Sequence, residues 1–252
     1  MKTIELETID STNTYAKAFL RENGACHEPL LILAKEQTGG RGRKGKSFSS
    51  VKGNGIYMTL CLPFSIRPEE AVFVTAAAGT AVREVLSELT GEDLTIKWVN
   101  DIYLGERKVA GILTEAVTDP ETGLLRYAVT GVGINLNADI GKMPQEVQTI
   151  AGTIPYAGDA SEVPFLVASR ILTTVELAFS GKEGRETVLT AYRGHSFLAG
   201  KYVTFTENGV LFEGLVQGID DGARLLVVTK EGLKALDSGE VSVKFPRKQE
   251  VF

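Results

Sequence analysis

The sequence predicts an α+β protein that ends in a small β barrel. In the first part of the chain, segments whose apolar residues alternate with period two, typical of strands, are interspersed with segments of helical period. After residue 200 the pattern changes to short alternating segments separated by Asn-Gly and Asp-Gly, which are typical of hairpin turns. We therefore expect a larger domain over residues 1–197 and a smaller β domain over residues 198–252.

The N-terminal half combines strands with two helices. The run DSTN at residues 10–13 supplies N-cap residues before a periodic stretch that should end near Gly24. Pro68 stands at a first-turn position and opens a long helix over residues 71–89, which is apolar nearly all round its first half and is therefore expected to be buried. Strands are expected at residues 4–9, 30–34 and 55–62.

The remaining elements follow the same two periodicities. Further strands are expected at residues 94–98, 108–117 and 125–136, and further helices at residues 165–179 and 186–192. A connection through Asn100 and Asp101, with a turn at Gly105, should join the first two of these strands. In the smaller domain the expected strands are residues 202–206, 211–219 and 225–228.

Composition excludes several classes of protein. The 252 residues include 32 acids and 27 bases, so the net charge of −5 argues against nucleic acid as a bulk partner. Hydrophobic residues make up 43% and charged residues 23%, as in globular proteins and unlike disordered ones. Cys26 and Cys61 form neither a disulfide framework nor a zinc motif, and no signal peptide or membrane-spanning run is present. A cytoplasmic protein is expected.

A basic, glycine-rich loop interrupts this acidic chain. Residues 35–52, KEQTGGRGRKGKSFSSVK, contain six bases and a single acid. The glycines free backbone N–H groups to point at a ligand, and Arg41 and Arg43 can bind phosphate or carboxylate oxygens in a bidentate fork. The loop is therefore a candidate anion site, and a solvated charged loop is the alternative.

The same loop imitates a nucleotide-binding motif. Residues 40–47, GRGRKGKS, match the P-loop pattern GxxxxGK[ST]. A genuine P-loop opens directly into a helix whose N-terminus holds the phosphates. Here FSSVKGNG follows, which forms helices poorly, so we reject the P-loop interpretation.

A second group of polar residues lies in residues 97–115, KWVNDIYLGERKVAGILTE. Alternation turns Lys97 away from its apolar neighbours and places Lys108 on the same face as Ala110 and Ile112. In the later segment GVGIN, alternation places Gly131, Gly133 and Asn135 together on one face of the expected strand. We expect one face of these strands to be core and the other a bare floor for a ligand.

The order of these pieces resembles the biotin protein ligases. DSTN, EQTGGRGRKGK, KWVNDIYLGERKVAGILTE and GVGINLN match the family's STN, its QTxGRGRxG loop, KWPND, the lysine ahead of xxGIL and the GIN turn, from about Ser11 to Asn137. The resemblance implies a mixed, largely antiparallel sheet with helices, as in class II aminoacyl-tRNA synthetases, and a C-terminal SH3-like barrel. Two residues depart from the pattern: Val99 replaces the proline of KWPND, and Phe48 replaces a tryptophan after the arginine loop.

The resemblance implies a reaction in two steps. The biotin carboxylate attacks the α-phosphate of ATP, which gives biotinyl-5'-AMP and pyrophosphate, and a lysine of a biotin carboxyl carrier protein domain of a carboxylase then attacks the mixed anhydride. Both reactants of the first step are anions, so fixed cations are required, and Lys108 and Arg43 are the candidate catalytic residues. Asp101 is a candidate for holding a metal, for orienting Lys97 or Lys108, or for capping a turn.

The family pattern also implies which residues bind the ligands. Mg²⁺ should accompany ATP, held mainly by phosphate oxygens and water, so its protein ligands are not assigned. The residues expected to bind biotin or the adenylate are Ser11, Thr12, Asn13, Gln37, Gly40, Arg41, Gly42, Arg43, Lys97, Trp98, Asn100, Asp101, Lys108, Gly111, Gly133 and Asn135.

Two other functions compete with biotin ligation. Lipoate protein ligases share the fold and the adenylate strategy, and a noncatalytic module that binds anions or RNA could use the same basic loop. Larger biotin ligases begin with a DNA-binding domain, whereas the first predicted strand here starts within ten residues of Met1. We therefore expect a ligase without repressor function and without DNA or membrane partners, and edge strands of its sheet would allow a homodimer.

Overall fold

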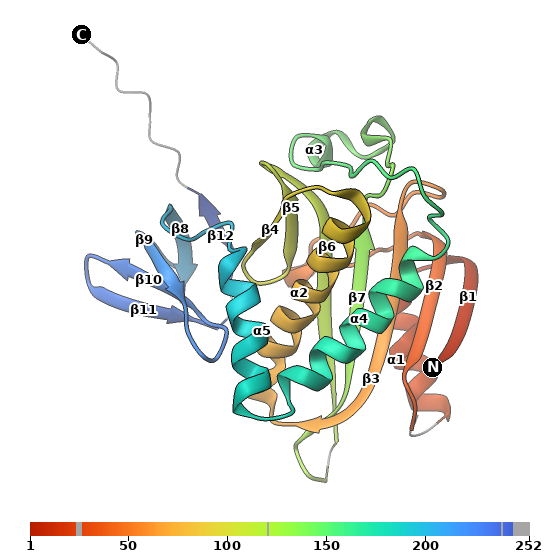
Figure 1. Ribbon diagram of the computed structural model, residues 1–252, viewed down its shortest axis with the longest axis horizontal. Helices are drawn as coiled ribbons and strands as arrows, with labels where there is room; N and C mark the ends of the chain where they lie inside the picture. The colour runs from red at the N-terminus through yellow and green to blue at the C-terminus, as the bar shows by residue number, and fades with distance from the viewer. Residues whose placement is uncertain (24–26, 120, 238, 244–252) are drawn as a thin grey trace.

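Two β-sheets organise the chain in the computed structural model, which describes residues 1–23, 27–119, 121–237 and 239–243 (Figure 1). The larger sheet consists of β1 (Lys2–Ile9), β2 (Leu30–Gln37), β3 (Ile56–Ile66), β4 (Leu94–Lys97), β5 (Asp101–Leu104), β6 (Arg107–Thr118) and β7 (Leu125–Ile134). The smaller sheet consists of β8 (Tyr202–Glu207), β9 (Val210–Ile219), β10 (Leu225–Thr229), β11 (Gly232–Leu236) and β12 (Val241–Val243).

The strand order confirms the predicted fold class. The larger sheet runs β1-β2-β3-β7-β6-β5-β4, and β1 and β2 pair in parallel, whereas its other neighbouring strands are antiparallel. The smaller sheet is antiparallel, in the order β11-β10-β9-β8-β12. The architecture is therefore α+β, with a mixed, largely antiparallel sheet followed by a C-terminal β unit; residues 244–252 lie outside the described part.

Helices cover both faces of the larger sheet (Figure 1). They are α1 (Thr12–Asn23), α2 (Ala71–Thr90), α4 (Val163–Ala178) and α5 (Lys182–Gly194), while the short helix α3 (Gln145–Gln148) lies in the connection between β7 and α4. The main core lies between the sheet and α2, α4 and α5, and a second cluster lies under α1 on the opposite face. None of the described helices is long and apolar enough to cross a membrane.

Burial on both faces explains two patterns in the sequence. Leu31 of β2 belongs to the main core, whereas Leu30 and Ile32 belong to the cluster under α1, so this strand reads as a continuous apolar run. Every residue from 73 to 82 of α2 is buried, as its all-round apolar first half predicted. Of the two cysteines, Cys61 is buried in β3, and Cys26 lies outside the described residues.

Four short elements were not predicted: α3, β5, β11 and β12. They span three to five residues each, which is too short for a periodicity to show. The missed strand β5 replaces the simple connection expected before Gly105, which does form the turn, with φ 57°. This strand matters for function because it carries Asp101 and Tyr103.

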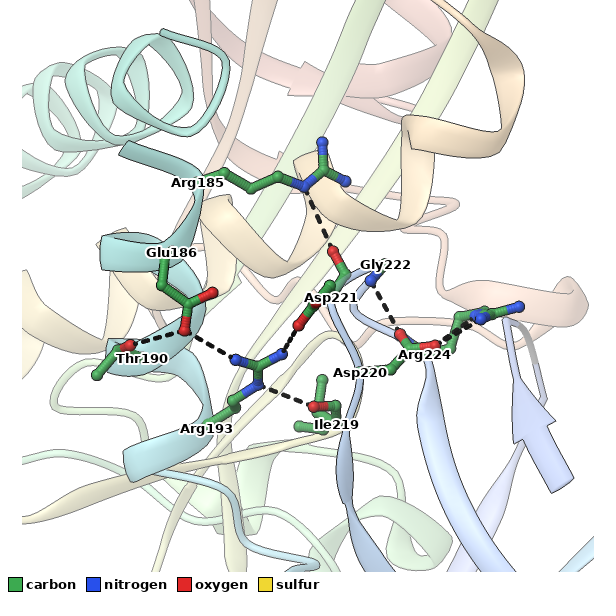
Figure 2. Close-up of polar contacts among 9 residues, drawn as sticks. All are labelled: Arg185, Glu186, Thr190, Arg193, Ile219, Asp220, Asp221, Gly222 and Arg224. Carbon is green, nitrogen blue, oxygen red and sulfur yellow. Dashed lines mark hydrogen bonds and ion pairs between the residues drawn. The ribbon is translucent and has the colours of Figure 1, made fainter. Parts of the chain in front are cut away.

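Polar contacts attach the smaller sheet to α5 (Figure 2). Arg193 of α5 donates from Nε to the carbonyl oxygen of Ile219 (2.8 Å) and from Nη2 to Oδ1 of Asp221 (2.7 Å). Deeper in the interface, the indole Nε1 of Trp98 donates to the carbonyl oxygen of Ala223 at 2.8 Å. The turn between β9 and β10 is thereby fixed against the larger sheet, and the main core continues into the smaller one.

Replacing Arg193 by alanine should loosen this attachment. Because the variant removes charge-assisted hydrogen bonds to a partly buried turn, we expect the free energy of unfolding to fall by about 1–3 kcal/mol, measured by urea denaturation. Arg126→Ala is the matched control, since Arg126 makes one 4.0 Å ion pair with Asp119 and is half exposed. Equal losses in the two variants would contradict a specific role for the α5 contact.

Candidate active site

A pocket of about 310 Å³ lies on the face of the larger sheet opposite α2, beside the N-terminus of α1. Its walls come from the start of α1, the basic loop, strands β4 to β7 and residues 239–242 of the smaller sheet's last strand and its approach. The volume is at the lower end of the range for small-molecule sites. The fold therefore gathers all the predicted motifs around one cavity.

One row of residues across four strands forms the pocket floor. The pairing register places Lys97 opposite Asp101, Asp101 opposite Gly111, and Gly111 opposite Gly133. Directly opposed residues point to the same face of a sheet. A Cβ on Gly133 would overlap the Phe48 ring, and one on Gly111 would lie 3.0 Å from Cε of Lys108. The glycines are thus required where the side chains of Phe48 and Lys108 approach the floor, and the prediction that a ligand lies against it stays a prediction.

The side chain of Lys108 lies on the pocket face of β6. The prediction that Lys108 shares a face with Ala110 and Ile112 is therefore wrong. Ile102 of β5 opposes Ala110, but Tyr103 opposes Lys108, which leaves Val109 as an extra residue in β6. Such a β-bulge re-aims the neighbouring side chain. Ala110 and Ile112 therefore remain in the core, while the Lys108 ammonium enters the pocket.

Lys108 pairs with the carboxylate on the neighbouring strand. Its Nζ lies 2.7 Å from Oδ1 of Asp101, an oxygen that is buried and makes no contact of regular hydrogen-bond geometry. The contact is therefore an ion pair. Burial lowers the pKa of Lys97, an effect that Asp101 opposes and Lys108 reinforces. Asp101 is thus paired with Lys108 and opposes Lys97 in the β4–β5 ladder, and its role in orienting them stays a prediction.

The basic loop folds over the pocket as a tight turn. The amide of Gly42 donates to the carbonyl oxygen of Lys46 at 2.7 Å. Nη1 of Arg43 donates to Oδ1 of Asn100 (3.3 Å), and Asn100 is itself fixed by donating from Nδ2 to the carbonyl oxygen of Ile112 (2.9 Å). Burial lowers the pKa of the Arg43 guanidinium, with Asp101 acting in the opposite sense; an arginine nevertheless stays charged near neutral pH.

The pocket concentrates positive charge on an acidic protein. The cations that line it are Arg41, Arg43, Lys44, Lys46, Lys97 and Lys108. The lining carboxylates are Asp101 and Glu240, and each is paired with a lysine: Glu240 lies 2.7 Å from Nζ of Lys46. The pocket therefore suits a ligand that carries several negative charges.

The described residues do not form a protein cage for a metal ion. No group of three or more His, Cys, Asp or Glu side chains that could hold one is found among them. Because both lining carboxylates are already neutralised by lysines, the pocket does not fit a Mg²⁺ ion held by protein ligands.

A hydrogen-bond network fixes the polar end of the pocket at α1. The side-chain oxygen of Gln37 accepts from the amide (2.9 Å) and the hydroxyl (3.1 Å) of Thr12, while its Nε2 donates to Oγ of Ser50 (2.8 Å). Thr59, fully buried in β3, lies with its hydroxyl 2.6 Å from Oδ1 of Asn13. Oγ of Ser11 accepts weakly from the amide of Thr14 (3.5 Å), as an N-cap does.

The predicted binding residues line this pocket, with two exceptions. Gly40, within the basic loop, does not line the pocket, and a Cβ on it would overlap the carbonyl oxygen of Phe48. Asn135 points away and donates from Nδ2 to the carbonyl oxygen of Gly152 at 2.9 Å. Both predicted pocket positions are therefore wrong, and these residues support the backbone instead. Trp98 lines the pocket, but its indole Nε1 donates to the carbonyl oxygen of Ala223 in the turn between β9 and β10.

Several lining residues were not predicted. They are Lys44, Lys46, Ser47, Met58, Tyr103, Ile112, Leu113, Val132, Ile150 and residues 239–242. Lys46 belongs to the recognised charge run and could have been chosen from it. Tyr103, whose ring lies 5.6 Å from Nζ of Lys97 and whose pKa burial raises to about 12, depended on the unpredicted strand β5. Nothing in the local sequence points to Ile150 or to the smaller sheet.

The two departures from the family pattern are both accommodated. Phe48 lies against the glycine floor. Val99 is buried, follows a cis Trp98–Val99 peptide bond, and its carbonyl oxygen accepts from the Tyr192 hydroxyl at 3.1 Å. The loop does not open into a helix as a P-loop does: the regular element that follows Ser47 is strand β3, and the next α-helix begins at Ala71.

Comparisons with known proteins agree with this arrangement. Residues 5–135 match the model of the Biotin/lipoate A/B protein ligase family, and residues 199–244 match the Biotin protein ligase C terminal domain. The chain is 29% identical over 239 residues to the bifunctional ligase/repressor BirA of Bacillus subtilis, covering 94% of this chain and 72% of that protein. It is 28% identical to the biotin--[acetyl-CoA-carboxylase] ligase of Mycobacterium tuberculosis, covering 87% and 80%.

A solved structure shows the same fold over nearly the whole length. Biotin protein ligase from Aquifex aeolicus in complex with biotin and ATP superposes with a TM-score of 0.77 at 27% identity, covering 96% of this chain and 98% of that one. The larger sheet, its helices and the C-terminal sheet therefore have a common arrangement in the two proteins.

Proposed function

Because the chain belongs to the biotin/lipoate A/B protein ligase family, we propose that this ligase joins biotin to ATP and then to an acceptor lysine. In the first step the biotin carboxylate oxygen bonds to the α-phosphorus of ATP and pyrophosphate leaves. In the second, the amine of a lysine on a biotin carboxyl carrier protein domain bonds to the acyl carbon, and AMP leaves. The cation-lined pocket with a glycine floor is the observation that carries this proposal.

The cations address the main obstacle to the first step. Two unit anions 4 Å apart repel by about 4 kcal/mol at an effective dielectric constant of 20. Lys108, held on the floor beside Asp101, is suited to bind carboxylate and phosphate oxygens where negative charge accumulates. Arg43, anchored by Asn100, is suited to hold the product phosphate from the loop side.

The uncharged end of the pocket suits a ligand with a polar ring. Biotin presents a ureido group with one acceptor and two N–H donors, and Ser11, Thr12, Asn13 and Gln37 offer partners of both kinds. Gly111 and Gly133 keep the floor free of side chains of its own, and the Phe48 ring and the Lys108 side chain lie over it. Mg²⁺ would enter with the triphosphate, bound by phosphate oxygens and water.

A mass assay tests the proposal against its rivals. The protein is incubated with ATP, an apo carrier domain, and either biotin or lipoate, and the acceptor is weighed. We expect the acceptor to gain one biotinyl group only when ATP and biotin are both present. Lipoylation would identify a lipoate ligase, and an unmodified but competent acceptor would favour a noncatalytic anion-binding module.

Other expectations stay predictions. They concern the division at residues 197 and 198, the lack of repressor function, the cytoplasmic location, the particular carboxylase served and the homodimer.

A further inference from the structure

We propose that Glu115 is a positioning residue for ligand recognition: with Lys17 it fixes the side-chain amide of Asn13 so that the carbonyl oxygen, and not the NH₂ group, is offered to the ligand. The inference rests on the proposed function, because it concerns how the pocket selects a ligand with N–H donors. Neither Glu115 nor Lys17 lines the pocket, so both would act through Asn13.

The contacts form a clamp between α1 and β6. Oε2 of Glu115 accepts from Nδ2 of Asn13 at 2.9 Å, and Oε1 accepts from Nζ of Lys17 at 2.6 Å. Nδ2 of Asn13 also donates to the carbonyl oxygen of Leu113 at 3.2 Å. Both hydrogens of the Asn13 NH₂ group are therefore used inside the protein.

Donor and acceptor chemistry fixes the direction of the amide. A carboxylate and a backbone carbonyl only accept hydrogen bonds, so the side of Asn13 that faces Glu115 and Leu113 must be the NH₂ group. Flipping the amide would bring its oxygen against two acceptors. Thr59 is compatible with this direction, because its buried hydroxyl, 2.6 Å from Oδ1, can donate to the carbonyl oxygen.

The carbonyl oxygen of Asn13 lies over the floor. A Cβ on Gly131, which lines the pocket, would overlap Oδ1 of Asn13, so this oxygen is held directly above the strand. A carbonyl oxygen has two lone pairs, of which Thr59 uses one. The second is available to an N–H group of a ligand.

Glu115 can hold this orientation because it keeps its charge. Burial alone would raise the pKa of Glu115, but the hydrogen bonds from Lys17 and Asn13 and the charges of Lys17 and Arg41 together outweigh burial, and the pKa of Glu115 is lowered. A carboxylate therefore faces the amide near neutral pH. The ureido N–H groups of biotin match the acceptor that results, whereas the dithiolane ring of lipoate has no N–H to donate.

Glu115→Gln tests the clamp with nearly unchanged shape. Asn13 and Lys17 donate to different oxygens of Glu115, and a glutamine places an NH₂ group at one of these two positions, so it cannot accept at both and no longer fixes the Asn13 amide as the carboxylate does. We expect the Kd for biotin, measured by calorimetry without ATP, to rise about tenfold, as for the loss of one oriented hydrogen bond. The KM for ATP should change no more than in the control.

Glu84→Gln is the matched control. Oε2 of Glu84 accepts from Nη1 of Arg170 at 3.1 Å between α2 and α4, and its side chain is 32% exposed against 26% for Glu115. Both variants remove one partly buried ion pair, so an equal fall in thermal stability is expected in both. A merely structural Glu115 would lower stability without a selective change in the Kd for biotin.

A second variant keeps the test decisive if Glu115→Gln does not fold. Lys17→Met removes the ion pair but leaves the contact between Glu115 and Asn13, so the Kd for biotin should rise by less than in Glu115→Gln, about threefold. A wild-type Kd in whichever of the two variants folds would overturn the positioning role. Failure of the wild-type protein to bind biotin would instead refute the proposed function.

Discussion

Replacing Lys108 by alanine is expected to slow adenylate formation about 10²–10³-fold, the usual effect of removing one group that stabilises developing charge. The Kd for biotin should stay within about threefold of the wild-type value, because contacts that strengthen only as charge develops contribute little to ground-state binding. The bulge in β6 aims Lys108 at the floor beside Asp101, where the carboxylate and the α-phosphate would meet.

Pyrophosphate release measures the rate, and calorimetry measures biotin binding in the same variant. Lys35→Ala serves as the control, because Lys35 is an exposed lysine whose ion pair with Glu7 lies outside the pocket. If Lys108→Ala released pyrophosphate at the wild-type rate, Lys108 would have no catalytic role. If the Kd for biotin rose while the rate at saturating biotin stayed unchanged, Lys108 would bind the ground state and the transition state equally.

Much of the fold could be predicted because burial leaves a periodic trace in the sequence. The first half of the long helix α2 and the first five residues of strand β2 are apolar on all sides, and the limits of both elements were found to within a few residues. The shorter elements β5, β11 and β12 leave no such trace, since three to five residues hold at most two periods of a strand. They form through pairing with longer neighbours.

The site was predictable where function requires a residue type, and not where it depends on geometry. The functional glycines and arginines could be chosen from the sequence. Few residues other than glycine allow another side chain to approach the backbone so closely, and few other than arginine bind an anion through a bidentate fork. The face of Lys108 depended on a bulge that alternation cannot reveal. The clamp at Glu115 joins residues 98 and 102 positions apart, so only the folded chain shows that Lys17 and Asn13 meet there.

Replacing Arg43 by alanine is expected to accelerate dissociation of biotinyl-adenylate about 10–100-fold, which corresponds to losing hydrogen bonds to a charged group. Arg43 is half-buried over the pocket and oriented by Asn100, so its guanidinium can hold phosphate oxygens without a large loss of side-chain entropy. A chase of preformed adenylate with unlabelled biotin and ATP measures the rate.

Arg43→Lys and Arg67→Ala sharpen this experiment. The lysine variant keeps a charge but loses the bidentate fork, so retention should fall to a value between wild type and alanine; Arg67, 66% exposed and outside the pocket, should have no effect. A wild-type dissociation rate in Arg43→Ala would contradict the role. Lys108 lies on the floor and Arg43 in the loop, so the Lys108 variant should slow adenylate formation and the Arg43 variants should weaken adenylate retention. If every variant impaired both steps equally, the two cations would act only through their combined positive electrostatic potential.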